Sequence, residues 1–359
     1  MNIGSEERAR QLSGRTMSNG QYRLLLTGMS VALAAMIIFA MCIGRYPVKV
    51  VDVVKVLWAR LTVLLGASEP AKTWDPMSEG VILTLRLPRI IASVLVGGAL
   101  SLSGAAYQGV FKNPLVSPDL LGVSNGACVG AAIAILLHLN DFGIQAMAFI
   151  LGIGTVMLTM SIPRLMRNDS VTMLVLAGII VGGIMSSVMG IIKYVADPET
   201  ELADITYWTM GTLKKVTGTD VLMVALPIII TMILLLAMRW QINLLSLGDN
   251  EAKTLGVRIR LVRGIIILCS TLLTACAVCI CGTIGWVGLV IPHLARMIVG
   301  PDNLKSLPMT LVLGSMFMLV VDTIARAATS LEIPLSILTG IIGAPFYLYI
   351  LVKQRMKMS

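Results

Sequence analysis

Long apolar runs, separated by short polar segments, occupy most of this 359-residue chain and restrict what it can fold into. A helix needs about 20 apolar residues to cross the hydrocarbon core of a membrane. Ten candidate runs are present, at residues 24–44, 90–110, 119–138, 143–163, 172–192, 221–238, 263–281, 284–299, 308–328 and 334–352. The sequence therefore predicts an all-α integral membrane protein of about ten transmembrane helices.

The composition agrees with a chain dissolved mostly in lipid. Hydrophobic residues make up 57% of it and charged residues only 13%, whereas soluble domains carry about 25% charged residues. No long polar stretch remains for a soluble domain. We expect a polar cytoplasmic tail at 1–23, followed by one transmembrane domain at 24–359.

The net charge of +9 is best explained by membrane topology. Basic residues concentrate in cytoplasmic loops of membrane proteins. Alternating the spans from a cytoplasmic N-terminus places Lys112, Arg164, Arg239 and Lys305 inside and leaves both termini cytoplasmic. Membrane lipid is therefore the expected surrounding partner, and nucleic acid is not.

The first apolar run, at 24–43, follows a basic segment and resembles a signal peptide. It is longer than the 7–15 apolar residues of a secretory signal, so we interpret it as an uncleaved first span. A signal cleaved at 32–34 is the alternative. Short surface helices are expected within 45–80 and within 196–218.

Glycines recur at four-residue spacing at Gly122, Gly126 and Gly130. Such spacing clears one helix face of side chains, so a neighbouring helix can approach closely. Close packing is the first interpretation, and a glycine-lined substrate path is the alternative.

No motif for bond chemistry is present. The sequence lacks the phosphate-binding pattern GxxxxGK[ST], a zinc-protease motif and a nucleophile elbow. Its two histidines, His138 and His293, are far apart, and Cys276 and Cys279 lie inside an apolar run, where cysteines act as small hydrophobes. We expect no catalytic residues, no metal site and no cofactor in this chain.

Ionisable residues inside a membrane mark functional sites, and few are present here. Asp322 and Arg326 lie four residues apart in the ninth run, where they can pair on one helix face. Ion-coupled transporters rely on carboxylates or histidines deep in their spans. Their scarcity argues against ion-coupled transport.

The segment 239–263 is the main polar segment on the predicted inner face. Acidic Asp249 and Glu251 precede a short helical stretch that ends at Gly256, which is the usual arrangement of helix caps. The segment is either a docking surface for a cytoplasmic partner or an ordinary solvated connection.

Several long stretches resemble the FecCD family, the permease subunits of type II ABC importers for siderophores, cobalamin and haem. The resemblance covers the chain from about residue 24 to its end. It rests on RLPRIIASVLVGGALSLSGAAYQGVFKNPLVSPDLLGVSNGA (86–127), SLGDNEAKTLGV (246–257), GTIGWVGLVIPHLAR (282–296), DTIARAAT (322–329) and EIPLSILTGIIGAPFYLYIL (332–351).

The resemblance implies a multi-pass permease of the bacterial plasma (inner) membrane, working as a dimer, most simply a homodimer. Two ATPase subunits that bind ATP and magnesium would attach from the cytoplasm, and an extracytoplasmic binding protein would deliver the cargo. The fifth and tenth helices, here 172–192 and 334–352, would line the path.

The implied cargo is an iron-siderophore type of metal chelate, moved by alternating access. Cobalamin, haem or a simple oxyanion is the alternative within the same class. A different class, an ion-coupled secondary transporter, and a multispanning membrane enzyme are less favoured.

By resemblance, three arginines face outward and pair with glutamates of the binding protein: Arg86, Arg89 and Arg326. For Arg86 and Arg89 the alternative role is a headgroup anchor, and for Arg326 it is the pair with Asp322. Arginine suits either role because its planar fork binds carboxylates through two hydrogen bonds.

The resemblance also assigns two inner sites. The coupling helices that contact the ATPase correspond to Leu247, Gly248, Asp249, Glu251, Ala252, Leu255 and Gly256 within the coupling segment 239–263. The cytoplasmic gate corresponds to Ser170, Val171 and Thr172.

Overall fold

A computed structural model describes the chain except for residues 1–16, 67, 69–71, 169, 330 and 359, and the described part is helical without strands. Seven of its helices are long and apolar enough to cross a membrane. They are α2 (Asn19–Cys42), the continuous helix Pro76–Phe111, α7 (Asp141–Leu165), α8 (Val171–Val195), α10 (Gly218–Ala237), α13 (Ile259–Cys281) and α15 (Asn303–Ala327).

Three further apolar helices are shorter: α6 (Val123–Leu136), α14 (Val287–Val299) and the apolar part of α16 (Leu335–Met358). With the seven long helices they account for the ten predicted runs. The all-α class is thus confirmed. The predicted tail 1–23 falls mostly on residues outside the described part, and α2 begins within it.

The helix Pro76–Phe111 is the centre of the bundle. It joins α4 (Pro76–Gly80), a π-helical turn η1 (Val81–Arg86) and α5 (Leu87–Phe111). Asp75 starts it by accepting a hydrogen bond from Ser78 N at 3.2 Å. The predicted span began only at residue 90. The observed helix is longer because the π turn ends at Arg86 and continues into α5, where Pro88 sits in the first turn and its missing N–H is tolerated.

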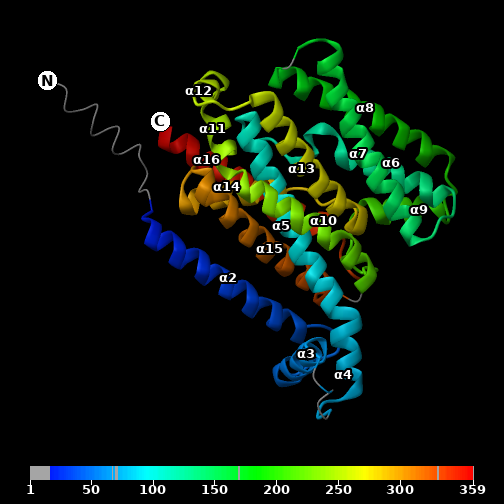
Figure 1. The fold of residues 1–359 in the computed structure, drawn as a ribbon. Coiled ribbons are helices and arrows are strands. Elements are labelled where there is room, and N and C mark those ends of the chain that lie inside the picture. Colours follow the sequence, from blue (N-terminus) through cyan, green and yellow to red (C-terminus); the bar gives the residue numbers. More distant parts are fainter. Residues whose placement is uncertain (1–16, 67, 69–71, 169, 330, 359) are drawn as a thin grey trace.

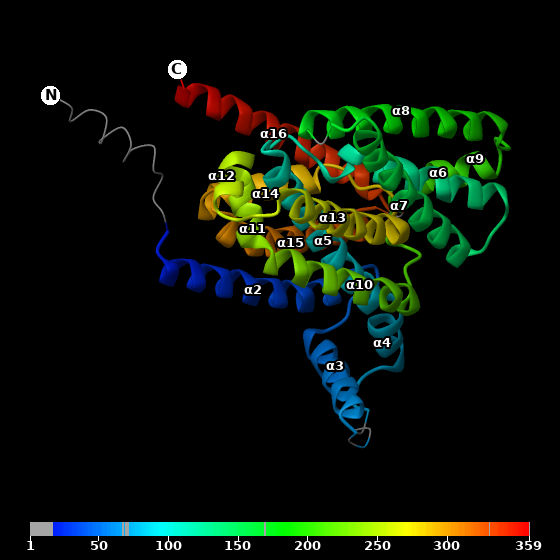
Figure 2. The ribbon, with the colours of Figure 1, turned by 45° about the horizontal axis from the view of Figure 1, so that its top comes forward.

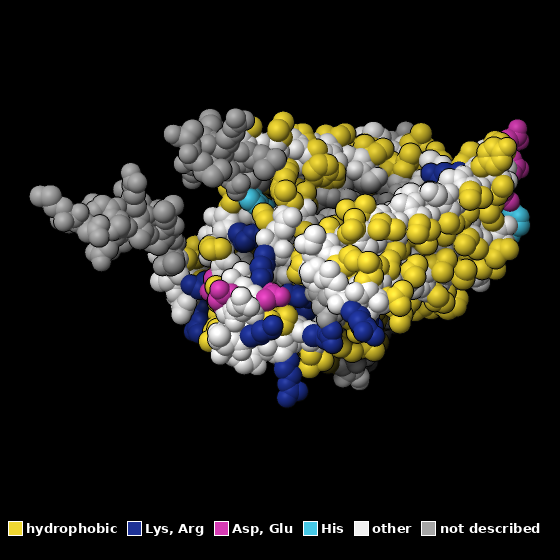
Figure 3. Space-filling model, turned by 90° about the horizontal axis from the view of Figure 1, so that it is seen from above, with side chains coloured by type: hydrophobic (Ala, Val, Ile, Leu, Met, Phe, Trp, Pro, Cys, Tyr) yellow, Lys and Arg dark blue, Asp and Glu magenta, His cyan; other side chains and the backbone are white. Residues whose placement is uncertain are grey.

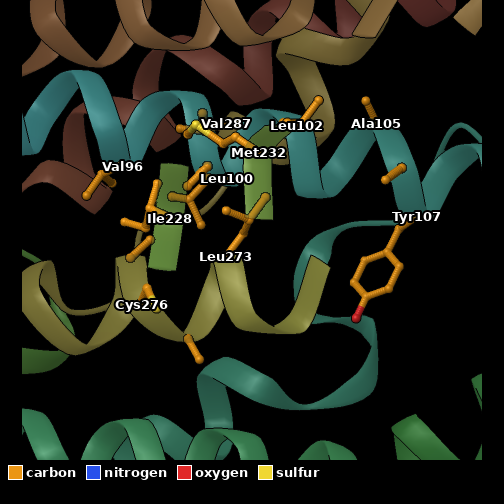
Figure 4. Packing of buried hydrophobic residues seen from close by; sticks show 14 of the residues in the cluster. Val96, Leu100, Leu102, Ala105, Tyr107, Ile228, Met232, Leu273, Cys276 and Val287 are labelled. Carbon is orange, nitrogen blue, oxygen red and sulfur yellow. The ribbon is translucent and has the colours of Figure 1, made fainter. Parts of the chain in front are cut away.

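Helices α10, α13, α14 and α15 surround α5, which runs through the middle of the fold (Figure 1). Figure 4 shows side chains of α5, such as Leu100 and Leu102, among Ile228 and Met232 of α10 and Leu273 of α13. The same seam is also hydrogen bonded, since the Tyr107 hydroxyl lies 3.0 Å from the Thr271 hydroxyl. The core is therefore apolar with a few internally satisfied polar groups.

Glycines bring the backbones of the central helices into contact. A Cβ on Gly97 of α5 would overlap the carbonyl oxygen of Gly314 on α15, and one on Gly104 would overlap that of Gly288 on α14. Ser101 donates a hydrogen bond across the first of these contacts to Thr310 O at 3.1 Å. Small residues with an interhelical hydrogen bond are the usual means of association in lipid.

The glycine series in α6 has the same role. A Cβ on Gly126 would overlap the Thr155 side chain of α7, and one on Gly130 would overlap the Met147 carbonyl. Close packing is thus confirmed for these two positions. Gly122, at φ 84°, instead separates a short 3₁₀ turn η2 (Pro118–Leu121) from α6, so α6 is shorter than the predicted span.

Short helices lie at both ends of the bundle. On one end are α11 (Arg239–Leu247) and α12 (Asp249–Thr254), near the start of α2 and the end of α16 (Figures 1 and 2). Away from that end lie α3 (Val50–Leu64) and α9 (Glu201–Thr209), which confirm the two predicted surface helices. The arrangement agrees with a topology that puts both chain ends and α12 on one membrane side.

The eighth span begins with an unusual backbone. Trp286, directly before α14, has φ 72°, in the region that favours glycine. Its side chain packs against Gly343 of α16, where an added Cβ would lie 2.6 Å from the Trp286 Cβ. The helix of this span therefore starts only at Val287, and Pro292 lies inside it.

Replacing Gly314 by valine should separate α5 from α15, because the new side chain has no space against Gly97 and Ser101. Overpacking of this kind costs about 1–3 kcal/mol or more. We expect a clear fall in the thermal unfolding temperature of the purified protein. Gly154→Val is the matched control, since a Cβ there meets nothing within 4 Å. Equal stability of the two variants would contradict the packing account.

Candidate functional site

A buried charge network lies at the end of the bundle away from α12. Arg89 of α5 donates through Nε to Asp322 Oδ1 at 2.8 Å and through Nη1 to both oxygens of Glu332, at 3.0 and 2.9 Å. Asp322 is fully buried, and Arg326 Nε lies 3.8 Å from its Oδ2. The predicted pair of Asp322 and Arg326 is confirmed, with Arg89 as a closer partner.

Other donors of the arginines bind backbone carbonyls near the end of α2. Arg86 donates to the carbonyls of Met41 and Tyr46, and Arg326 donates to that of Ala40. Gly44 permits this approach, since a Cβ there would lie 2.6 Å from Arg86 Nη2. The network therefore fastens α2, α5, α15 and the segment before α16 to one another.

The three arginines predicted to face a binding protein thus lie together, but in this chain they point inward. Their exposed fractions are only 6% for Arg86, 8% for Arg89 and 8% for Arg326. Their hydrogen bonds go to partners within the chain. Contact with a binding protein stays a prediction, and neither a headgroup anchor nor docking is needed to explain these residues in the monomer.

A second charge cluster lies at the opposite end of the bundle, where it fixes the coupling segment. Asp249, the first residue of α12, accepts hydrogen bonds from Lys112 Nζ at 3.0 Å and from Arg263 Nη2 at 2.9 Å. Partial burial works to raise the pKa of Asp249, but these two cations outweigh it and hold the pKa below its ordinary value. A single carboxylate therefore joins α12 to the ends of α5 and α13.

The shape of α12 is that of a short projecting helix. Gly248 enters it at φ 153° and Gly256 leaves it at φ 80°. The amides of Gly256 and Val257 donate to the carbonyls of Lys253 and Ala252, at 2.9 and 3.0 Å, which is the Schellman pattern of a helix end. The predicted glycine cap at the end of the helix is thus confirmed, whereas Asp249 and Glu251 lie in its first turn rather than before it.

Side chains of the segment divide into inward and outward sets. Ala252 is fully buried, whereas Leu247 and Leu255 are 64% and 60% exposed. Glu251 folds back toward Gly248, where a Cβ would overlap its carboxylate. Two large exposed apolar side chains flank the firmly anchored helix α12 and form a candidate protein-docking surface, which we call the coupling knob (residues 247–256).

The predicted gate residues begin α8. Ser170 caps this helix by accepting a hydrogen bond from Met173 N at 3.2 Å, and its own amide donates to Asn168 Oδ1 at 3.1 Å. Val171 and Thr172 follow as the first helical residues. Ser170 thus lies directly before α8 and the other two residues lie in its first turn, and a gating role stays a prediction.

The helices predicted to line the path carry broad unpacked apolar faces. Exposed side chains include Leu176, Ile180 and Ile184 on α8, and Ile337 and Ile341 on α16. In Figure 2 both helices lie along the upper side of the molecule. These faces are available either to lipid or to a second chain.

The histidines and cysteines lie in ordinary surroundings. His138, at the end of α6, is 3.4 Å from Glu201, and His293 packs edge-on against Tyr347 at 6.2 Å between ring centres. The thiols of Cys276 and Cys279 are buried and unbridged. Among the described residues no group of three or more histidine, cysteine or acidic side chains is placed to hold a metal.

Sequence reasoning missed the partners that complete both charge clusters. Lys112 and Arg263 lie 137 and 14 residues from Asp249, and Glu332 lies 243 residues from Arg89. No local spacing rule connects such residues. The only available signal was that Lys112 and Glu332 fall within the resembling stretches.

Replacing Asp322 by asparagine should destabilise the outer end of the bundle, because buried Arg326 would lose its carboxylate partner and Arg89 would keep only Glu332. Removing one partner of a buried ion pair costs about 3–5 kcal/mol. Thermal unfolding of the purified protein measures the effect, with the surface change Glu199→Gln as the matched control. An unchanged unfolding temperature for Asp322→Asn would show that the network contributes little.

Comparison with known proteins agrees with this geometry. The model of the FecCD transport family matches residues 24–353. The chain is 38% identical to the molybdate import system permease protein MolB of Haemophilus influenzae, over 92% of this chain and 96% of the relative. It is 39% identical to a probable iron chelatin transport system permease protein of Helicobacter pylori, over 77% and 83%.

A solved structure shares the fold. It is an inward-facing conformation of a metal-chelate type ABC transporter, with a TM-score of 0.82 and 36% identity, and the match covers 92% of this chain and 99% of that one. The family match covers nearly all of the transmembrane bundle, including both charge clusters. The chain therefore belongs to the FecCD transport family and is the multi-pass permease subunit of a type II ABC importer.

Proposed function

We propose that this chain forms the translocation path of an importer that carries an iron-siderophore type of metal chelate across a bacterial inner membrane. Separate ATPase subunits, binding ATP and magnesium, drive it by alternating access, and an extracytoplasmic binding protein delivers the cargo. The coupling knob is the observation that carries the proposal, since it gives an ATPase a rigid place to act.

The knob suits this role because it is anchored yet projecting. Asp249 transmits a displacement of α12 directly to Lys112 at the end of α5 and to Arg263 near the start of α13. Because α5 and α13 are the most buried long helices, a push on the knob reaches the centre of the bundle. Leu247 and Leu255 supply the apolar contact.

Placing a charge in that contact should uncouple the ATPase. Leu255→Asp is expected to reduce co-purification of the ATPase at least about tenfold, since burying an unpaired carboxylate at an interface costs several kcal/mol. The fold should survive because the side chain is exposed. Leu137→Asp is the control, because Leu137 is an equally exposed leucine that directly follows α6 and lies outside the knob. Equal ATPase recovery from both variants would exclude the knob as the docking site.

The second permease chain is proposed to cover the apolar faces of α8 and α16. The path would then run between two copies, with these helices as its walls. Their exposed side chains are mostly apolar, so these helices would give a cargo a surface with few polar contacts. Such a surface does not by itself select one metal compound over another.

A cysteine on α16 should report this dimer. We expect Ile341→Cys, 66% exposed in the monomer, to form a covalent dimer with a short bis-maleimide in membranes. Leu222→Cys on α10 is the matched control, because it is equally accessible but lies on another helix. The unmodified chain, with its own cysteines, sets the background. Cross-linking of Leu222→Cys alone would place the interface elsewhere.

We propose that the arginine network forms the docking surface for the binding protein on the outer side. Arg326 and Arg89 already hold carboxylates, and a glutamate of a binding protein would compete with Glu332 for Arg89. The measurement is the affinity of the binding protein for Glu332→Gln, which should rise if Arg89 is released toward the partner. An unchanged affinity would leave the network a purely internal clamp.

Molybdate is the second candidate cargo, favoured by the 38% identity to MolB over 92% of this chain. Relatives named for hemin and cobalamin transport, from Yersinia pestis and Halobacterium salinarum, are 37% and 36% identical. We expect ferric siderophore, delivered by the cognate binding protein, to be taken up by proteoliposomes containing the complete transporter and ATP. Uptake of molybdate, haem or cobalamin in its place would reassign the cargo.

A further inference from the structure

A groove of about 840 Å³ opens on the bundle surface where the last turns of α7 meet α12 and the start of α13. Its apolar lining includes Met157, Met160, Leu261 and Leu268. Three of these, Met157, Leu261 and Leu268, are more than half exposed. None of them belongs to the predicted path helices α8 and α16.

Basic side chains line the same groove. Arg164 comes from the end of α7, Lys253 from α12 and Arg258 from the turn before α13, and Arg260 also contributes. None of the lining residues is acidic, and Arg164, Lys253 and Arg258 form no ion pair with any carboxylate in the described part of the chain. Figure 3 shows Lys and Arg side chains gathered at this end of the molecule.

On the topology predicted from the sequence, the groove lies at the depth of the inner lipid headgroups. Arg164 is in the last turn of α7 and Arg258 caps α13, so both mark where the spans leave the membrane. Trp240, half exposed beside Arg258 in an adjoining hollow, is placed as in an interfacial aromatic belt. Met157 and Leu268 lie seven and ten residues from these cations, or roughly 10–15 Å deeper along their helices.

We propose that this groove binds an anionic phospholipid of the inner leaflet, with its phosphate among Arg164, Lys253 and Arg258 and an acyl chain along Met157, Gly264 and Leu268. Basic side chains beside an apolar lining favour a ligand that has both an anionic headgroup and an acyl chain. Basic pockets between membrane helices on the cytoplasmic side attract anionic headgroups. A free phosphate would leave the apolar floor exposed, and a zwitterionic lipid would bring no net negative charge.

Bound there, the lipid would bridge two parts of the chain. Lys253 belongs to the coupling knob, whereas Arg164 belongs to the bundle. The lipid site itself follows from the groove and its charges and does not depend on the cargo or on the knob's partner.

Gly264 offers a way to fill the groove without touching its charges. It lines the groove, and a Cβ there would meet nothing within 4 Å. Gly264→Leu should therefore fold normally while occupying the acyl-chain space. Arg164→Gln combined with Arg258→Gln removes two of the headgroup contacts and leaves the apolar floor intact.

The test uses the full-length permease in detergent, alone and assembled with its ATPase. Dioleoyl phosphatidylglycerol, dioleoyl phosphatidylcholine or inorganic phosphate is titrated in, and bound ligand is counted by native mass spectrometry. We expect phosphatidylglycerol to bind in preference to the other two. The double glutamine variant should weaken its binding about 30-fold, on the usual contribution of a basic residue near a membrane surface. Gly264→Leu should weaken it as well.

Two control variants test whether the loss of lipid binding is specific to the groove. Arg23→Gln removes a cation from α2 and Gly154→Leu adds a side chain on a lipid-facing part of α7, and neither should change lipid binding. Equal binding of both lipids, binding of phosphate alone, or equal effects of Gly154→Leu and Gly264→Leu would overturn the proposal. So would displacement of the lipid by the ATPase, which would assign the groove to a protein interface. Failure of the ATPase to assemble would count against the proposed function only.

Discussion

Contact between helix backbones, made possible by glycine, is the constraint on which this structure depends. Lipid supplies no hydrophobic force between helices, so association relies on close packing and interhelical hydrogen bonds. Gly97 against Gly314 and Gly104 against Gly288 bring α15 and α14 directly onto α5. Once α5 is enclosed in this way, its Ser101 can bond across to α15, and α10 and α13 cover its remaining sides.

The two ends of the enclosed helix are held by charge, in different ways. At one end Arg89 is buried with Asp322 and Glu332, and its contacts are internal to the chain. At the other end Lys112 and Arg263 hold Asp249 of a helix that projects from the bundle. A buried network favours rigidity, whereas a half-exposed carboxylate between two cations permits a limited movement. This difference fits an outer end that stays fixed and an inner end that receives a mechanical input.

The basic groove beside the coupling knob would bring a membrane lipid into contact with the inner end of the bundle. The knob, the groove and the inner ends of α7 and α13 meet within one region, where Lys253 belongs to both the knob and the groove. A lipid headgroup there would sense any displacement of α12. Cargo selection is a separate matter, because relatives of similar identity are named for molybdate, iron chelatin, hemin and cobalamin transport.

The sequence alone determined the class, the approximate spans, the capped helix ending before Gly256 and the pair of Asp322 with Arg326. Each of these depends on local hydrophobicity or on spacing within one helix, which the order of residues specifies directly. Tertiary structure decided which charges complete each cluster, that the outer arginines turn inward, and that α7 and α13 leave a basic groove between them. Lys112, Glu332 and Arg164 acquire these roles only when helices distant in sequence pack together, and no local pattern encodes that juxtaposition.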